Sequence, residues 1–150
     1  MTGIGVTDMP TFADIDGQRP FSRAAEAQPD RVTMRLLVIE DDRDAADYLV
    51  KAFREVGHVA DSATDGDDGL TMAADGQYDV LIVDQKMPEL TGAELVQTLR
   101  DRGHRDKVIV VSALVSSDIR ETYDRLDVHD IFTKPFNVDE LRSAVDRLAA

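Results

Sequence analysis

The sequence predicts an α/β domain in which a doubly wound parallel sheet of five strands lies between two layers of helices. Residues 36–39, 80–83 and 108–111 are short, continuously apolar and largely β-branched, which is typical of strands buried on both faces of a parallel sheet. Helical patterns separate these runs, and such alternation indicates right-handed βαβ units with helices on both sheet faces. The 150 residues suffice for one domain with a substantial core.

The first half of this domain contains two strand–helix pairs. Residues 36–39 form the first strand, and the apolar face of the helix that follows repeats at i, i+3, i+4, i+7 and i+10. That face consists of Ala46, Leu49, Val50, Phe53 and Val56. Gly57 closes the helix. A short, weak strand is expected over residues 58–63, and a small helix that ends near Gly76 follows it.

The second half contains three further pairs, with strands expected over residues 80–83, 108–111 and 131–133. Thr91 and Glu94 form a capping box at the start of the third helix. The fourth helix, over about residues 116–126, has the least regular pattern. The last helix begins at Asn137, with Glu140 three residues further on as a second capping signal.

The composition excludes several classes of protein. A net charge of −13 argues against a general nucleic-acid binder, because such proteins need a basic surface. The absence of cysteine excludes disulfides and thiolate metal sites. No apolar run approaches the roughly 20 residues of a membrane span, and the N-terminus lacks a signal-peptide pattern. We therefore expect a cytoplasmic protein that does not contact a membrane.

The chain divides near Met34. Residues 1–33 contain three of the five prolines and no lasting hydrophobic period, so we interpret them as a flexible tail. Residues 34–150 form the domain. Met34 opens the first strand directly, which makes it a candidate alternative start.

Polar side chains follow the strands at the points where they end. Glu40 and Asp41 follow the first strand, Asp84 the third, Ser112 the fourth and Lys134 the fifth. Ligands of open α/β sheets bind at the carboxyl ends of the strands, so these side chains should converge. Magnesium takes one or two carboxylates together with waters and phosphate oxygens, and lysine binds phosphate as a point charge. The set predicts a site for Mg²⁺ and a phosphoryl group.

Simpler roles remain open for individual residues. For Asp42, capping of the following helix is a better interpretation than metal binding. Ser112, taken alone, is equally consistent with a turn serine that bonds its own backbone. Lys134 before Pro135 is also consistent with a surface lysine at a turn, although a cis bond at Pro135 would direct the ammonium inward.

Taken in order, these residues resemble the receiver domain of two-component response regulators. The resemblance covers residues 34–150 and implies a flavodoxin-like three-layer (βα)5 fold with strand order 2-1-3-4-5. It rests on Glu40-Asp41, on Asp84 within the segment DVLIVDQKMPELTG, on Ser112-Ala113 and on Lys134-Pro135-Phe136.

The resemblance implies that Asp84 accepts a phosphoryl group from a sensor histidine kinase or a histidine phosphotransfer protein. Ser112 would then bond the phosphoryl group, and Lys134 would pair with Asp84 or with the new phosphate. The implied Mg²⁺ ligands are Asp41 and Asp84 directly, Glu40 through water, and the backbone carbonyl of Lys86. Such a protein is a signalling switch and not a turnover enzyme.

Two positions depart from the family pattern. Ile131 replaces the aromatic residue that usually stands three before the lysine, and strand alternation places Phe132 on the opposite face. Asp127-Val128 stands where Gly-Ala is frequent, which is expected to reshape the turn before the last strand. Without the aromatic ring, coupling between phosphorylation and output is expected to rest mainly on Ser112 and Lys134.

The output is expected to be a protein–protein contact. The chain ends at Ala150, directly after the last helix, which suggests a stand-alone receiver. The family usually signals through the face of the fourth helix, fifth strand and fifth helix. Candidate residues there are Arg120, Tyr123, Asp127 and Arg142, although a solvated surface is the simpler interpretation of each. A receiver cut from a longer transcription factor and a receiver-fold binding module that no longer switches are the alternatives, and the oligomeric state is not predicted.

An enzyme of a different class is a weaker hypothesis. A haloacid-dehalogenase-like phosphatase also uses an aspartate nucleophile and magnesium, but it needs a second acid two residues after the nucleophile. That position is Lys86. A flavodoxin-like nucleotide binder is also disfavoured, because no glycine-rich phosphate loop follows residues 36–39.

The domain boundary is testable by truncation. A protein that starts at Met34 should fold and should accept phosphate at the rate of the full chain, because residues 1–33 carry no candidate site residue. Circular dichroism and a phosphorylation time course on both proteins check this expectation. Loss of folding in the shorter protein would mean that the tail packs on the domain.

Overall fold

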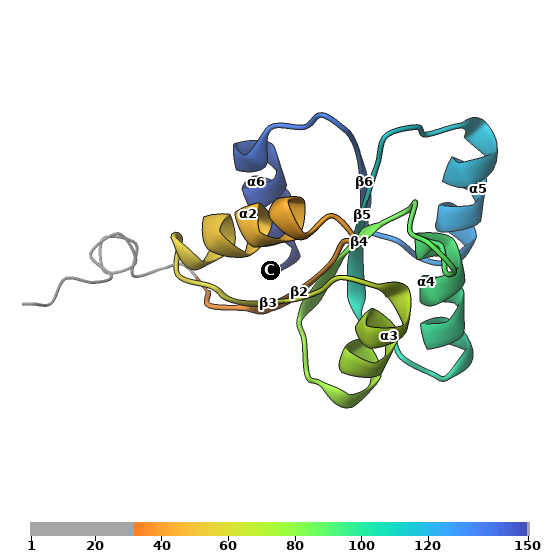
Figure 1. Ribbon diagram of the computed structural model, residues 1–150, viewed down its shortest axis with the longest axis horizontal. Coiled ribbons are helices and arrows are strands. Elements are labelled where there is room, and N and C mark those ends of the chain that lie inside the picture. The colour runs from red at the N-terminus through yellow and green to blue at the C-terminus, as the bar shows by residue number, and fades with distance from the viewer. Residues whose placement is uncertain (1–31, 150) are drawn as a thin grey trace, which may run out of the picture.

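The computed structural model, which describes residues 32–149, contains one five-stranded sheet with helices on both faces (Figure 1). The strands are β2 (Arg35–Ile39), β3 (Val59–Ala63), β4 (Val80–Asp84), β5 (Lys107–Ser112) and β6 (Asp130–Thr133). All pair in parallel, in the order β3-β2-β4-β5-β6. This is the predicted order 2-1-3-4-5, which is therefore confirmed.

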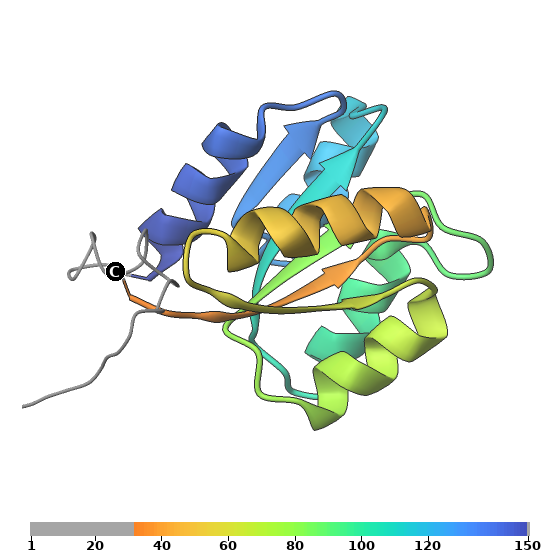
Figure 2. The same cartoon turned by 60° about the vertical axis from the view of Figure 1, so that its left-hand side comes forward.

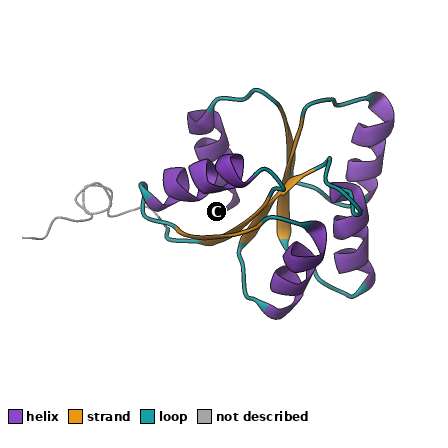
Figure 3. Cartoon of the chain, in the orientation of Figure 1, coloured by secondary structure: helices purple, strands orange, loops and turns teal. Residues whose placement is uncertain are grey.

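Two helices cover one face of the sheet and three cover the other, an arrangement that Figures 2 and 3 illustrate. Helices α2 (Arg43–Arg54) and α6 (Val138–Leu148) lie on the first face, and α3 (Gly66–Asp75), α4 (Gly92–Asp101) and α5 (Ser117–Arg125) lie on the second. None of these helices in the described part of the chain is both long enough and apolar enough to cross a membrane.

The core is divided by the sheet into two apolar clusters. Alternate residues of β2 supply each side: Leu36 and Val38 face α2 and α6, whereas Leu37 and Ile39 face the other three helices. The central strand β4 is buried along its whole length. Burying one such aliphatic side chain contributes roughly 1.5–3 kcal/mol, so these continuous apolar runs fix the sheet and thereby the positions of the strand ends.

Side-chain caps define the starts of the helices as predicted. Asp42 caps α2 by accepting a hydrogen bond from the Ala45 backbone, which favours the capping interpretation of this residue. The reciprocal bonds of the capping box between Thr91 and Glu94 are both present at α4. Asn137 caps α6 by accepting bonds from the backbone amides of the first turn.

The prediction was less accurate between the first helix and the second strand. Helix α2 ends at Arg54, so Val56, which was assigned to its apolar face, lies in the turn that follows. The strand begins at Val59 and not at His58, because the backbone amide of His58 bonds the carbonyl of Phe53 across this turn.

The expected tail lies almost entirely outside the described residues. Only residues 32 and 33 of the segment 1–33 are described, and they have no regular secondary structure. The division at Met34 therefore stays a prediction, although Met34 itself is buried in the core.

The turn before β6 accommodates its unusual sequence. Asp127 has a φ of 58°, in the left-handed region that aspartate tolerates better than most residues with a Cβ atom. Ile131 and Phe132 contact opposite core clusters, as strand alternation predicted. Phe132 packs edge-to-face against Phe136, so its ring lies on the face of the sheet that α2 and α6 cover.

The close contact between α3 and β2 gives a test of the packing. A Cβ atom at Gly69 would lie 2.6 Å from Cγ2 of the buried Ile39. Alanine favours a helix interior over glycine by about 1 kcal/mol, but overpacking costs about 1–3 kcal/mol. We therefore expect Gly69→Ala to lower the free energy of unfolding by up to about 2 kcal/mol in urea denaturation.

The matched control for this test is Thr71→Ala, on the exposed side of the same helix. It offers the gain in helix propensity without a clash, so its stability should stay equal or rise slightly. A Gly69→Ala protein as stable as this control would show that Ile39 moves aside at no cost.

Candidate functional site

The five candidate side chains gather at the carboxyl edge of the sheet, as predicted. Asp84 and Ser112 are the last residues of the neighbouring strands β4 and β5, and Lys134 follows β6. Glu40 and Asp41 follow β2, the other neighbour of β4. Parallel pairing of β2, β4, β5 and β6 therefore brings residues far apart in sequence to one end of the sheet.

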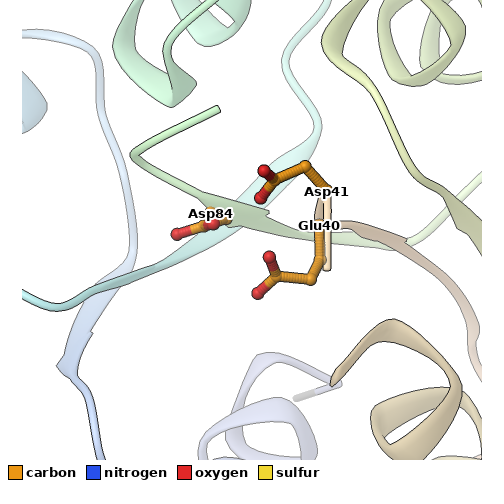
Figure 4. A group of neighbouring side chains, drawn as sticks. All are labelled: Glu40, Asp41 and Asp84. Atoms are coloured by element: carbon orange, nitrogen blue, oxygen red, sulfur yellow. The ribbon is translucent and has the colours of Figure 1, made fainter. Parts of the chain in front are cut away.

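The carboxylates of Glu40, Asp41 and Asp84 form a compact acidic cluster. One oxygen from each lies within 4.8 Å of the others. Glu40 and Asp84 are only 2% and 4% exposed, whereas Asp41 is exposed. Glu40 and Asp41 extend from the end of β2 toward the side on which Asp84 lies (Figure 4). Three acids this close repel one another, so a nearby cation stabilises their ionised forms.

Lys134 supplies one cation in the protein itself. Its ammonium lies 3.0 Å from a carboxylate oxygen of Glu40 and 3.3 Å from one of Asp84. Burial lowers the pKa of Lys134, but the hydrogen bond to Glu40 and the negative charges of Asp84 and Glu40 outweigh it, so the pKa is raised. Because of this pairing, Lys134 is a charged member of the site and not a free surface lysine. The bond between Lys134 and Pro135 is cis.

The donor set fits a second cation. Although Asp41 is exposed, the loss of some of its hydration, a hydrogen bond with Glu40 and the negative charge of Glu40 raise its pKa. Asp41 therefore bears repulsion that Lys134 does not remove. Hard carboxylate oxygens on an accessible edge are the ligands that Mg²⁺ takes, with water filling the remaining positions. Asp42 is not among the clustered oxygens, and its backbone amide bonds Glu40 at 3.1 Å.

Ser112 is near the site but bonds its own loop. Its hydroxyl donates to the carbonyl of Leu114 at 2.8 Å and accepts from the Leu114 amide at 3.3 Å. Ser112 is therefore a turn serine that bonds its own backbone in this structure, which was one of the two interpretations of this residue. A role toward a phosphoryl group requires the hydroxyl to leave Leu114, and that role stays a prediction.

The loop after Asp84 joins the site to α4. Lys86, whose carbonyl was a predicted metal ligand, is exposed in this loop, and Met87 is buried. A Cβ atom at Gly92 would lie 2.7 Å from the carbonyl oxygen of Asp84, so only glycine fits there without a shift. The side chain of Gln85 accepts from the Ala93 amide at 3.1 Å.

Two of the expected output residues lie elsewhere. Tyr123 is 0% exposed and packs in the core with α3 and α4, so its assignment to the surface was wrong. Arg142 donates to the carbonyl of Ala52 and pairs with Glu55, which commits it to the contact between α6 and α2. Arg120 and Asp127 are exposed. The spacing of Ile119, Tyr123 and Leu126, at i, i+4 and i+7, is that of one apolar helix face and could have placed Tyr123 inward.

Sequence comparison identifies relatives across the whole domain. The family model of the response regulator receiver domain matches residues 36–146. The transcriptional regulatory protein PcoR of Escherichia coli is 34% identical over 116 residues, which cover 76% of this chain and 50% of that protein. The transcriptional regulatory protein CusR of E. coli is 33% identical over 115 residues, with coverage of 77% and 51%. The chain thus spans about half the length of these curated relatives.

Solved structures agree with the sequence comparison. The receiver domain of Francisella response regulator 1452 has a TM-score of 0.74 at 34% identity, and the match covers 77% of this chain and 96% of that one. The response regulator TrrA of Thermotoga maritima, in complex with Mg²⁺ and BeF, has a TM-score of 0.68 at 29% identity, with coverage of 77% and 99%.

The acidic cluster predicts opposite effects of one substitution on stability and metal binding. A raised pKa means that ionisation of Asp41 is less favourable in the folded protein, so stability is lost as the pH rises through that pKa. Asp41→Asn should therefore raise the metal-free melting temperature at pH 7 and weaken Mg²⁺ binding. The gain should shrink toward about pH 4, where aspartate takes up a proton.

Thermal melts at several pH values and magnesium titrations check both effects. The control is Asp47→Asn, an exposed acid on α2 outside the cluster, which should change neither. If Asp41→Asn were less stable than the unmodified protein at pH 7, the Asp41 carboxylate would be stabilising the fold, and its repulsion by the neighbouring acids would not be the dominant effect.

Proposed function

Because the chain belongs to the response regulator receiver domain family, we propose that it accepts a phosphoryl group on Asp84. The donor is a phosphohistidine on a sensor histidine kinase or a histidine phosphotransfer protein, and the reaction depends on Mg²⁺. Receiver domains are signalling switches, and no turnover activity is proposed for this chain. The expected location is the cytoplasm, where the catalytic parts of such kinases act.

The observation that carries this proposal is the environment of Asp84. Asp84 ends the most buried strand, and its carboxylate is paired with Lys134 at 3.3 Å beside two further acids. An Asp84 oxygen attacks phosphorus, the bond from phosphorus to the histidine nitrogen breaks, and an acyl phosphate forms. The ammonium of Lys134 stabilises negative charge on the transferred oxygens.

Asp41 and Asp84, with Glu40 through water and the carbonyl of Lys86, are the proposed Mg²⁺ ligands. A metal held by these residues would neutralise charge on the phosphoryl oxygens. The relative solved with Mg²⁺ and BeF supports this assignment by family resemblance. Glu40 has a further role, because it orients Lys134 through a 3.0 Å bond.

Switching is proposed to begin at Ser112. Phosphorylation adds about −1.5 to −2 charge and new hydrogen-bond acceptors beside β5. The hydroxyl of Ser112 exchanges its bonds with Leu114 for a bond to the phosphoryl group. The loop that carries Ser112 leads into α5, so this exchange alters the face formed by α5, β6 and α6, where the downstream protein binds.

A second candidate is the receiver part of a longer transcriptional regulator. The observation that favours it is the half-length match to PcoR and CusR. Phosphorylation would be the same in both cases, but the output would be an attached domain and not a separate partner. The mass of the native protein in a cell extract, detected with an antibody against residues 34–150, distinguishes the two.

The acceptor assignment is tested by chemical phosphorylation. Incubation with acetyl phosphate and Mg²⁺ should add one phosphoryl group to the intact mass of the unmodified protein. The expected acceptor is Asp84, because its carboxylate lies beside Lys134 and the two other acids of the cluster. Asp84→Asn should lose the adduct, and the exposed control Asp47→Asn should keep it. An adduct that persists in Asp84→Asn would exclude Asp84 as the acceptor.

A further inference from the structure

Tyr123 anchors helix α5 to the interior of the domain. Among the residues of α5, all of which the structure describes, Tyr123 alone is classed as buried, at 0% exposure. Its ring lies in the cluster formed with Leu95, Leu99 and Val110 from α4 and β5. The position of α5 therefore depends on this side chain more than on any other of the helix.

The Tyr123 hydroxyl reaches the residue directly after the proposed phosphoacceptor. It donates a hydrogen bond to the side-chain oxygen of Gln85. A Cβ atom at Gly92 would lie 2.9 Å from this hydroxyl and 2.7 Å from the carbonyl oxygen of Asp84. Burial and the negative charge of Asp84 both raise the pKa of Tyr123. The hydroxyl therefore stays protonated and can donate the hydrogen bond to Gln85.

Gln85 connects three elements at this point. Its backbone amide bonds Val111 of β5, its carbonyl accepts from Gly92, and its side-chain oxygen accepts from both Ala93 and Tyr123. A change in the Asp84 loop therefore alters one acceptor that is shared by α4 and α5. Buried polar groups need such partners, so the bond from Tyr123 cannot be given up without another acceptor.

Ile131 cannot link the core cluster to the Asp84 loop through a polar aromatic side chain. It packs against the same core cluster as Tyr123 but has no ring and no polar atom in its side chain. Phe132 packs on the other face of the sheet. Tyr123 belongs to this cluster, is aromatic, and places its hydroxyl at the loop after Asp84.

We propose that Tyr123 is the positioning residue that couples phosphorylation of Asp84 to helix α5, through its hydrogen bond to Gln85. This inference rests on the proposed phosphorylation of Asp84 and deepens it. A residue transmits a signal only through contacts that differ between the two states. The Gln85 oxygen moves with the phosphorylated loop, whereas the Tyr123 ring moves with α5, so the bond between them changes when the loop rearranges.

The test compares backbone amide NMR shifts with and without beryllofluoride and Mg²⁺. Tyr123→Phe keeps the buried ring and removes only the hydroxyl. We expect it to retain the shifts of residues 84–87 and to lose at least half of the shifts of residues 117–125. Tyr48→Phe, on the exposed face of α2, is the matched control and should behave like the unmodified protein.

A second variant and a ring signal separate coupling from folding. Gln85→Met removes the shared acceptor at similar length, so it should reproduce the loss in α5, and the double variant should lose no more than either single one. The chain has three tyrosines and no tryptophan, so labelled tyrosine rings are easily assigned. The Tyr123 ring signal should shift with beryllofluoride, and that of Tyr48 should not.

The outcomes are distinct. Full α5 shifts in Tyr123→Phe would overturn the coupling role and leave the phosphorylation of Asp84 intact. No shift at residues 84–87 in the unmodified protein would overturn the proposed function, and this inference with it.

Discussion

The pairing of Lys134 with Glu40 and Asp84 is the interaction on which the site depends. The sheet places three acids at one edge, and two of them are almost completely buried. A buried charge without a partner costs several kcal/mol. The ammonium at 3.0 and 3.3 Å offsets this cost for Glu40 and Asp84, whereas Asp41 is exposed to solvent. Charge compensation therefore keeps a buried carboxylate at the end of β4 without destabilising the fold.

In the proposed function, the scaffold separates the site of phosphorylation from the face that binds a partner. The apolar strands β2, β4 and β5 form a rigid centre that fixes the strand ends, where the candidate site residues lie. Within α5, Tyr123 is the one residue classed as buried, and Ile119 and the following Leu126 pack on the same core cluster. The proposed switch would act on this helix through the contacts that differ between its two states.

Much of this arrangement follows from local patterns in the sequence. Continuous apolar runs identified β2, β4 and β5, because buried parallel strands tolerate few alternatives, and capping residues located α4 and α6. The end of α2 was misplaced because Val56 continues the helical spacing although Gly57 turns the chain with a φ of 96°. The hydrogen bond between Tyr123 and Gln85 was not predicted, because it joins residues 38 positions apart and no periodicity encodes such a contact.

A double-mutant cycle at Lys134 tests the account most directly, in the absence of Mg²⁺. Lys134→Met should lower the free energy of unfolding by about 2 kcal/mol or more, because it leaves buried carboxylates without their cation. In a Glu40→Gln, Asp84→Asn background the same substitution should cost much less, because no charge remains to compensate. Equal losses in the two backgrounds, measured by urea denaturation, would contradict the claim that Lys134 is held at this edge by the acids.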